Sequence, residues 1–368
     1  MLISGQHISA ADCTDDSSHT PYITGPSDLI DGHILVTKYT AKPKVLCESG
    51  DILVTVKGSG TGTVFRADGQ YCISRQLMAI RPILSDPGFV YHVLVFNTHK
   101  YARAAAGLIP GIVRRDLLNT RILLPPREEQ CAIAALLFTW DRAIEQTRRL
   151  MEARRLLKKG LMQRLLTGRQ RLPGFHKKWQ WPRAEDMFRD HSCRDWAGET
   201  LLSVTQEQGI VPRGSLDARV TMPHGAIDAF KLVEPGDFVI SLRSFQGGIE
   251  LSNCRGIVSP AYTVLKPRGT IHNRFFGHYF KSQAFIGRLS AVLTGIREGK
   301  QIRYVDFSAT KIPNPPIDEQ QAIADVLDAA TKEVRLLERQ IEMLRLQKQA
   351  LMQKLLTGQI RVKIPKEA

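Results

Sequence analysis

Few residue patterns in this chain have the spacing of catalytic groups, and each of them is weak. Glu298-Gly299-Lys300 has the ExK spacing of metal-dependent nucleases. A match with one free position is common by chance, and no Pro-Asp pair precedes it to complete a metal site. We therefore favour a basic loop at DNA for residues 297–303, with Arg297 and Lys300 as its DNA-binding residues. Metal-dependent cleavage by Glu298 and Lys300 is kept as a weaker alternative.

A second pattern, Asn314-Pro315-Pro316-Ile317, has the form of the base-flipping motif of amino-methyltransferases. That motif needs an aromatic residue after the prolines to stack on the flipped base, and here the residue is Ile317. Neither an adenosylmethionine loop nor a GxxxxGK[ST] loop accompanies it. We read the prolines as the start of a helix, since proline suits the first turn.

A glycine-rich loop, residues 58–62, could be taken for a nucleotide-binding loop. It lacks the GxGxxG spacing, and Val64-Phe65 continues as a strand instead of opening a helix. Two interpretations stay open. Lys57, Ser59 and Thr61 could contact DNA backbone or base edges, because glycines let backbone N–H groups approach a phosphate. The loop could also be a plain hairpin turn.

Turn residues in the second half of the chain could read base edges. Arg243, Ser244, Gln246 and Tyr262 combine hydrogen-bond donors, acceptors and an aromatic ring. Arginine can read guanine and glutamine can read adenine in the major groove. The alternative carries equal weight: Phe245 and Tyr262 would be core residues, and Arg243 a surface charge.

The composition agrees with a globular chain that has an acidic partner. Fifty-one Lys plus Arg against 36 Asp plus Glu give a net charge of +15, and 43% of the residues are hydrophobic. No apolar run approaches the roughly 18 residues of a membrane span, and the N-terminus has no secretory pattern. The six cysteines form no CxxC pair and the ten histidines no paired metal spacing. We therefore expect no metal site, no disulfide framework and a cytoplasmic location.

The chain contains an internal repeat. Residues 161–168, Leu-Met-Gln-Arg-Leu-Leu-Thr-Gly, return almost unchanged at 351–358. In the same alignment and without gaps, 125–171 and 315–361 are identical at 21 of 47 positions, where chance would give two or three. The segments between the copies are loosely repeated as well, since Gly50-Asp51-Ile52 has a counterpart in Gly236-Asp237-Phe238.

Each repeat is predicted to form one long helix. Two prolines followed by acidic residues mark its start, and Gly168 or Gly358 marks its end. A 4–3 apolar spacing predicts a seam, interrupted at one equivalent place by Lys158 and Lys348. We expect the two helices to pack as an antiparallel pair; two separate amphipathic helices are the alternative. The expected seam residues are Ile133, Leu137, Ile144, Leu327, Val334, Leu337, Ile341, Leu344 and Leu351.

The predicted fold class is α+β, with an internal pseudo-twofold repeat. Two mixed, strand-rich variable domains are separated by the two long helices, which pack as an antiparallel coiled coil. Alternating β-branched and aromatic residues with turns between them predict the strands. The expected boundaries are 1–121 for the first domain, 122–172 for the first repeat, 173–311 for the second domain and 312–368 for the second repeat and tail.

This arrangement resembles the specificity subunit of type I restriction–modification systems. The resemblance rests on the two Pro-Pro-x-Glu/Asp-Glu-Gln helix starts, the twin helix ends, and residues 167–175 leading to Trp179. Residues 22–28, 50–60 and 74–81 look like one type of target-recognition domain, and 256–262 like another. The resemblance implies DNA contacts for these motifs, with Arg75 among them.

The resemblance also implies a function without catalysis. Each variable domain would read one half of an asymmetric bipartite site in double-stranded DNA. The helices would space the domains and dock two modification subunits that carry S-adenosylmethionine. Restriction subunits would add ATP- and Mg-dependent translocation and cleavage. A truncated or silent copy that binds partners but not DNA is the runner-up.

One departure from the family pattern concerns the start of the first domain. Leu2-Ile3-Ser4 is expected to correspond to Leu201-Leu202-Ser203. The equivalent of residues 181–200 would then be missing from the first domain.

Overall fold

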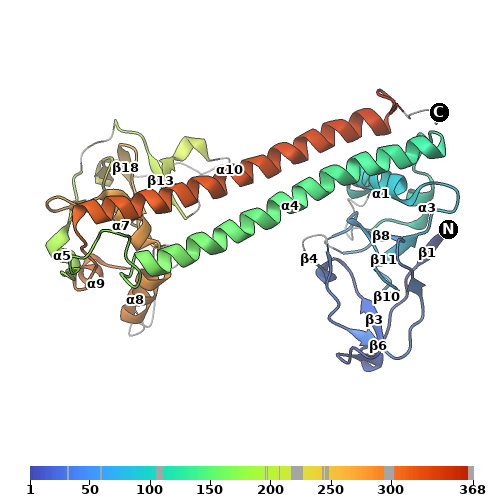
Figure 1. The fold of residues 1–368 in the computed structure, drawn as a ribbon, viewed down its shortest axis with the longest axis horizontal. Coiled ribbons are helices and arrows are strands. Elements are labelled where there is room, and N and C mark those ends of the chain that lie inside the picture. Colours follow the sequence, from blue (N-terminus) through green and yellow to red (C-terminus); the bar gives the residue numbers. More distant parts are fainter. Residues whose placement is uncertain are drawn as a thin grey trace. The chain divides into compact units, whose positions relative to one another are not determined.

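The computed structural model describes residues 1–30, 33–58, 60–104, 111–194, 196, 198–206, 208–216, 227–242, 244, 248–293 and 302–363. The chain divides into two compact units. Unit 1 comprises residues 1–148 and 339–368, and unit 2 comprises residues 149–338. Two long helices, α4 (Arg127–Leu165) and α10 (Ile317–Leu356), contribute to both units (Figure 1). Among the described residues, no helix is long and apolar enough to cross a membrane.

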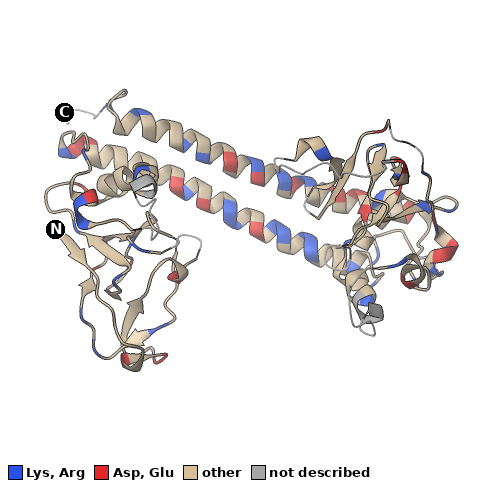
Figure 2. Cartoon of the chain, turned by 180° about the vertical axis from the view of Figure 1, so that it is seen from behind, with Lys and Arg blue, Asp and Glu red and all other residues tan. Residues whose placement is uncertain are grey.

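The two long helices pair antiparallel within each unit. In unit 1, Ile133 and Leu137 of α4 share an apolar cluster with Met352 and Leu355 of α10. In unit 2, Leu165 of α4 lies in a cluster with Ile323 and Leu327 of α10. Figure 2 shows Lys and Arg interspersed with Asp and Glu along both helices. The expected antiparallel pairing is confirmed.

The nine predicted seam residues are all removed from solvent to some degree. Three are half-buried, namely Ile144, Leu344 and Leu351. Six are buried: Ile133, Leu137, Leu327, Val334, Leu337 and Ile341. An apolar seam of this kind supplies most of the stability of a long helix, because helical propensity alone is marginal.

Unit 1 is built on two sheets. The four-stranded sheet has the order β1 (Leu2–Ser4), β11 (Leu77–Ile80), β8 (Ile52–Thr55), β9 (Val64–Arg66), with every neighbour antiparallel. The second sheet has the order β2 (Cys13–Thr14), β6 (Tyr39–Thr40), β3 (Thr20–Ile23), β10 (Tyr71–Ile73), β7 (Leu46–Cys47). A short pair, β4 (Leu29–Ile30) and β5 (His33–Ile34), and helices α1 (Pro87–Phe96), α2 (Thr98–Ala104) and α3 (Arg114–Leu118) complete the unit.

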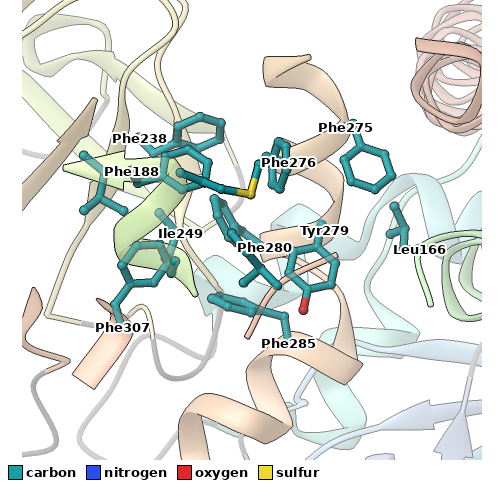
Figure 3. Packing of buried hydrophobic residues seen from close by; sticks show 14 of the residues in the cluster. Leu166, Phe188, Phe238, Ile249, Phe275, Phe276, Tyr279, Phe280, Phe285 and Phe307 are labelled. Carbon is teal, nitrogen blue, oxygen red and sulfur yellow. The ribbon is translucent and has the colours of Figure 1, made fainter. Parts of the chain in front are cut away.

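Unit 2 has one four-stranded sheet and two separate antiparallel strand pairs. The sheet has the order β12 (Phe188–Asp190), β19 (Thr263–Pro267), β16 (Phe238–Ile240), β17 (Glu250–Leu251). The pairs are β13 (Leu202–Thr205) with β14 (Gly209–Pro212), and β15 (Lys231–Val233) with β18 (Gly256–Val258). The helices are α5 (Ala184–Met187), α7 (Asn273–Phe280), α8 (Gln283–Leu293) and α9 (Tyr304–Ser308). Rings from the sheet, α7, α8 and α9 form an aromatic core around Phe280 (Figure 3).

The four-stranded sheets of the two units have the same strand order. The spacing of their strands along the chain is also the same: the first sheet has strands that begin at positions 2, 52, 64 and 77, and the second at 188, 238, 250 and 263. Strand β1 (Leu2–Ser4) therefore corresponds to β12 (Phe188–Asp190). Helices α1 and α7, which begin at Pro87 and Asn273, keep this correspondence.

This correspondence corrects one expectation. The predicted equivalence of Leu2–Ser4 with Leu201–Ser203 is wrong. Residues 202–205 form β13, which pairs with β14 outside the shared sheet. The sequence pattern was misleading because both segments begin with leucine and have serine at the third position. Only Leu2–Ser4 forms a strand of the four-stranded sheet that the two units share.

Candidate nucleic-acid interface

Three loops of unit 1 meet at one edge of its sheets. They are the turn at Gly25-Pro26, the glycine-rich loop between β8 and β9, and the turn at Arg75-Gln76 between β10 and β11. A Cβ atom at Gly60 would lie 2.3 Å from Cγ of Pro26, and one at Gly25 would lie 2.4 Å from Oε1 of Gln76. At Gly60 the rigid ring of Pro26 leaves no room for a side chain, whereas at Gly25 a side chain would only displace the flexible end of Gln76. These close approaches bring the loops into one cluster.

Backbone hydrogen bonds hold this loop cluster together. Val56 donates its N–H to the carbonyl oxygen of Gln76 at 2.7 Å, which places Lys57 next to the Arg75-Gln76 turn. The hydroxyl of Ser74 donates to the carbonyl oxygen of Thr24. The segments that carried the family resemblance in this half of the sequence therefore converge on one surface.

The predicted contact residues of unit 1 are accessible at this surface. Lys57 and Arg75 are exposed. Thr61 is half-buried, and its hydroxyl donates to the carbonyl oxygen of Gly58 at 2.6 Å, which closes the hairpin turn. Ser59 lies outside the described residues. The loop is thus a hairpin turn by geometry, with its basic residue accessible to a ligand.

A cavity of about 390 Å³ lies beside the Arg75-Gln76 turn. Lys38, Arg75 and Gln76 are exposed at its wall. Lys38 and Gln76 were not predicted from the sequence. The signal for Gln76 was its position directly after Arg75, because arginine and glutamine are the common readers of guanine and adenine.

Unit 2 offers a different surface, a cavity of about 580 Å³. Its polar wall consists of Thr205, Gln206, Gln208, Ser241 and Tyr262. The half-buried ring of Tyr262 lines the cavity and also packs against an apolar cluster that includes Val239 and Val264. The glutamines at 206 and 208 were missed, because β13 and β14 carry no motif that marks them.

A buried carboxylate, that of Glu250, also lines this cavity and pairs with a partly exposed lysine. The carboxylate of Glu250 is 2.7 Å from Nζ of Lys281. Burial raises the pKa of the Glu250 carboxyl, and the charge of Lys281 opposes part of that shift. Glu250 therefore lies where a carboxylate could accept a hydrogen bond from a base edge.

The remaining predicted contact residues are either buried or outside the described part of the chain. Ser244 is buried, and its hydroxyl accepts the backbone N–H of Ser241 at 2.8 Å, which fits a structural role in the turn. Arg243, Gln246, Arg297 and Lys300 lie outside the described residues, and so does Glu298. Within the described ranges, no group of three or more His, Cys, Asp or Glu residues could hold a metal ion.

The Pro-Pro motif of each repeat does more than start a helix. The amide of Gln130 donates to the carbonyl oxygen of Pro125 and accepts the N–H of Asp86, which precedes α1. Gln320 makes the same two bonds, to Pro315 and from His272, which precedes α7. Each motif thus fastens a long helix to the first helix of a variable domain. The repeated glutamine was the sequence signal for this role.

The acidic residue of each motif binds the end of the other repeat. Arg171 makes a two-pronged ion pair with Glu319, and Arg361 makes the equivalent pair with Glu129. The two glutamates occupy one position of the repeat, and the two arginines occupy another. The Arg361 guanidinium holds the pKa of the Glu129 carboxyl below its usual range.

Comparisons with known proteins agree with this architecture. Residues 2–153 and 227–346 match the family described as type I restriction modification DNA specificity domain. The putative MjaX type I restriction enzyme specificity subunit of Methanocaldococcus jannaschii is 26% identical over 343 residues, covering 85% of this chain and 79% of that protein. The MjaVIII specificity subunit of the same organism is 24% identical over 350 residues, covering 87% of this chain and 81% of that protein.

Solved structures show the same fold. The S subunit of a type I restriction–modification system from M. genitalium superposes with a TM-score of 0.58 at 16% identity, covering 97% of this chain and 93% of that one. A chain from a study of complex assembly and conformational transition in a type I R-M system also gives 0.58, at 19% identity, with 95% of each chain covered.

Proposed function

The chain belongs to the family of type I restriction–modification specificity subunits, and on that premise we propose that its two units each read one half of an asymmetric bipartite DNA site. It is a recognition subunit and not an enzyme. The proposal concerns how the recognition is divided between the units.

One observation supports the proposal: the two units share a four-stranded sheet and its attachment to the long helices, but they differ in the strands around that sheet. Both have the same four-stranded sheet and the same tie to the long helices. Beyond this frame, unit 1 has a five-stranded sheet, while unit 2 has two separate strand pairs. The shared sheet supports the surrounding loops in the same way in each unit. Because those loops differ, the two units would read different bases.

The proposed contacts differ in kind between the units. In unit 1, Lys57 would hold a phosphate, and Arg75 with Gln76 would read base edges. In unit 2, Gln208 and Tyr262 would read bases from the larger cavity. The charge of +15 supports a duplex as the ligand, because phosphate neutralisation dominates such binding.

Exposed leucines on the long helices support docking of two modification subunits. Leu156 of α4 in unit 2 and Leu346 of α10 in unit 1 are 69% and 51% exposed. They are equivalent positions of the repeat. An exposed leucine that recurs at the same repeat position suits two copies of one partner. In this proposal, S-adenosylmethionine is bound by the modification subunits, and ATP and Mg²⁺ by restriction subunits.

The test is co-expression with the modification subunit in a methylation-free host, followed by genome-wide mapping of methylated adenines. We expect one asymmetric bipartite motif, methylated on both strands. Arg75→Ala should relax one half of the motif only, and Gln208→Ala the other half only. Lys57→Ala should weaken binding to all sequences about equally.

Two results would contradict the proposal. One is a variant in either unit that relaxes both halves of the motif, because this would refute the division of recognition. The other is an assembled complex that methylates no motif, which would favour the silent copy that binds partners only. Leu156→Lys and Leu346→Lys should each remove one modification subunit from the complex, as measured by native mass spectrometry.

A further inference from the structure

Unit 2 has a second cavity, of about 590 Å³, between its part of the helix pair and the turn that joins β13 to β14. We call it the helix-side cavity. Its wall contains residues of α4, α7 and α10 together with Gln206, Gln208 and Glu250. The last three residues also line the cavity of about 580 Å³ that is proposed to read bases. The two cavities therefore share part of their wall.

The helix-side cavity contains more cations than carboxylates. Each carboxylate in the described part of its wall already pairs with a cation of the same wall. The pairs are Glu250 with Lys281, Asp328 with Arg274, and Glu338 with Arg155. Two cations remain, the half-buried Lys158 of α4 and the exposed Arg335 of α10. Neither side chain forms a hydrogen bond or an ion pair with any residue that the structure describes.

The two remaining cations are close enough to affect each other. Burial lowers the pKa of Lys158, and the positive charges of Arg335 and Lys281 lower it further. The carboxylates of Glu338 and Asp328 act in the opposite direction and offset only part of this shift. Unpaired cations that face one cavity repel each other, and a bound anion would remove that repulsion.

Unit 1 has different charges at the equivalent positions of its repeat. The lysine is retained as Lys348. Thr331 of unit 2 is replaced by Asp141, and Arg335 is replaced by Glu145. Lys348 pairs with Asp141. The seam lysine of unit 1 therefore has its anion within the chain, whereas that of unit 2 has an unpaired arginine as its neighbour.

We propose that the helix-side cavity binds a phosphate of the DNA backbone between Lys158 and Arg335, beside the half-site that unit 2 reads. This inference rests on the proposed function, because the shared wall brings the bound anion next to Gln208. A strand that is read at its base edges carries a phosphate at every nucleotide, so a phosphate is available to the neighbouring cavity. The contact fixes the register of unit 2 on the duplex and carries no sequence information.

The test uses the chain assembled with its modification subunits and a fluorescein-labelled duplex of random sequence. Fluorescence anisotropy at several salt concentrations gives the slope of log K against log salt. Lys158→Gln should weaken binding about tenfold at low salt and reduce this slope by about 1, because one phosphate contact is lost. Arg335→Gln should have the same effect.

A matched control lies one turn away on α10. Lys332 is exposed and is not part of the cavity wall. Lys332→Gln removes the same charge as Lys158→Gln and should leave the slope unchanged. An equal reduction of the slope in this variant would overturn the proposal, because the effect would then come from net charge and not from the cavity.

Thr331→Asp closes the site without removing a cation. It gives Lys158 a carboxylate partner like the one that Lys348 has in Asp141. The carboxylate would take the place of the phosphate, so duplex binding should weaken as in Lys158→Gln. Because the variant adds an ion pair, a loss of binding cannot be attributed to a loss of the fold.

Neutral phosphates locate the contact. Methylphosphonates are placed one at a time in a duplex that carries the motif found by methylation mapping. One substitution beside the half-site of unit 2 should weaken binding to the unchanged chain and should not weaken binding to Lys158→Gln further. Additive effects at every position would contradict the contact.

Two further outcomes would overturn the proposal. The first is an unchanged salt slope in both Lys158→Gln and Arg335→Gln. The second is the loss of a modification subunit from Lys158→Gln in native mass spectrometry with an unchanged slope, since an acidic side chain of that subunit would then be the occupant. If mapping finds no motif but Lys158→Gln still reduces the slope, half-site reading fails and the phosphate contact stands.

Discussion

The two units have equivalent ion pairs at the junctions, where each long helix begins. They differ in the side chains that lie midway along the helix pair. At the junctions, Glu129 with Arg361 and Glu319 with Arg171 are interchangeable in type and geometry. Midway along the seam, the units diverge. His92 of unit 1 packs on the ring of Phe138, with centroids 4.6 Å apart. Its equivalent in unit 2, His278, has Nε2 2.7 Å from Asp328, which replaces that phenylalanine in the repeat.

The two lysines of the seam also differ between the units, but here the ion pair is in unit 1. In unit 1, Lys348 pairs with Asp141 at 2.5 Å. In unit 2, position 331 holds threonine, and Lys158 has no ion-pair partner among the described residues. Burial lowers the pKa of Lys158, and the nearby charges of Arg335 and Lys281 add to that shift. The same Glu–Arg ion pair therefore forms at the ends of the helix pair in both units. Midway along the helices, the carboxylate lies at a different position of the repeat in each unit: Asp141 in unit 1 and Asp328 in unit 2.

The largest effect is expected from a charge in the seam. Leu137→Asp and Leu327→Asp change equivalent residues that are fully buried in unit 1 and unit 2. Each should lower the free energy of unfolding by about 3–5 kcal/mol, because an unpaired carboxylate is buried. Urea denaturation measures the loss. Leu336→Asp, on the exposed side of α10, is the control and should change little. Unchanged stability of either buried variant would refute the common seam.

A smaller and unequal effect is expected at the junctions. Glu319→Ala removes a fully buried carboxylate and leaves Arg171 and the indole of Trp179 without their acceptor. The loss should be about 3 kcal/mol in urea denaturation. Glu129→Ala should cost less, since the side chain of Arg361 is largely exposed to water. Equal losses would mean that the indole adds nothing to the junction of unit 2.

Acid should distinguish the seam histidines. Burial lowers the pKa of His92 to about 3, and the charges of Lys348 and Arg66 contribute. The histidine of the unfolded chain is protonated near pH 6.5, whereas that of the folded chain stays neutral. The contribution of His92 to the free energy of unfolding is therefore complete above pH 6.5 and is lost as the pH falls toward 3. His92→Phe should spare about 2 kcal/mol of the loss between pH 7 and pH 5.

His278 provides the comparison for this acid effect. Burial lowers its pKa as well, but the hydrogen bond to Asp328 opposes the shift. His278→Phe should therefore spare less stability at pH 5 than His92→Phe does. A larger effect for His278→Phe in the same urea titrations would show that Asp328 does not compensate its burial.

The smallest effect is expected from exchanging the seam carboxylate. Thr331→Asp gives Lys158 the partner that Lys348 has, and should stabilise the chain by about 0.5–1 kcal/mol. Asp141→Thr removes that partner in unit 1 and should be destabilising by at least as much, since Lys348 is nearly buried. The double variant should be close to additive in thermal denaturation. A destabilising Thr331→Asp would show that the two lysines occupy different environments.

The two long helices were predictable from the sequence because their apolar residues are periodic. Heptad spacing, prolines and glycines act locally, and the internal repeat doubled each signal. The glutamate and arginine of each ion pair recur in both repeats, so the sequence held a signal for them. Their pairing was missed because the two members of each pair lie far apart in sequence. The surfaces proposed to read DNA were not predictable in the same way. Gln76 and Gln208 line cavities only because loops without a shared motif converge there, and Ser244 turned inward to cap its own turn.

The interchangeable junctions have a genetic consequence. The repeats that supply Glu129, Arg171, Glu319 and Arg361 are nearly identical over 161–168 and 351–358, just before the closing arginines. A crossover between the genes of two related chains within these repeats would join unrelated variable domains while keeping both ion pairs. Each such exchange would yield a chain that keeps both junctions and carries a new pair of variable domains.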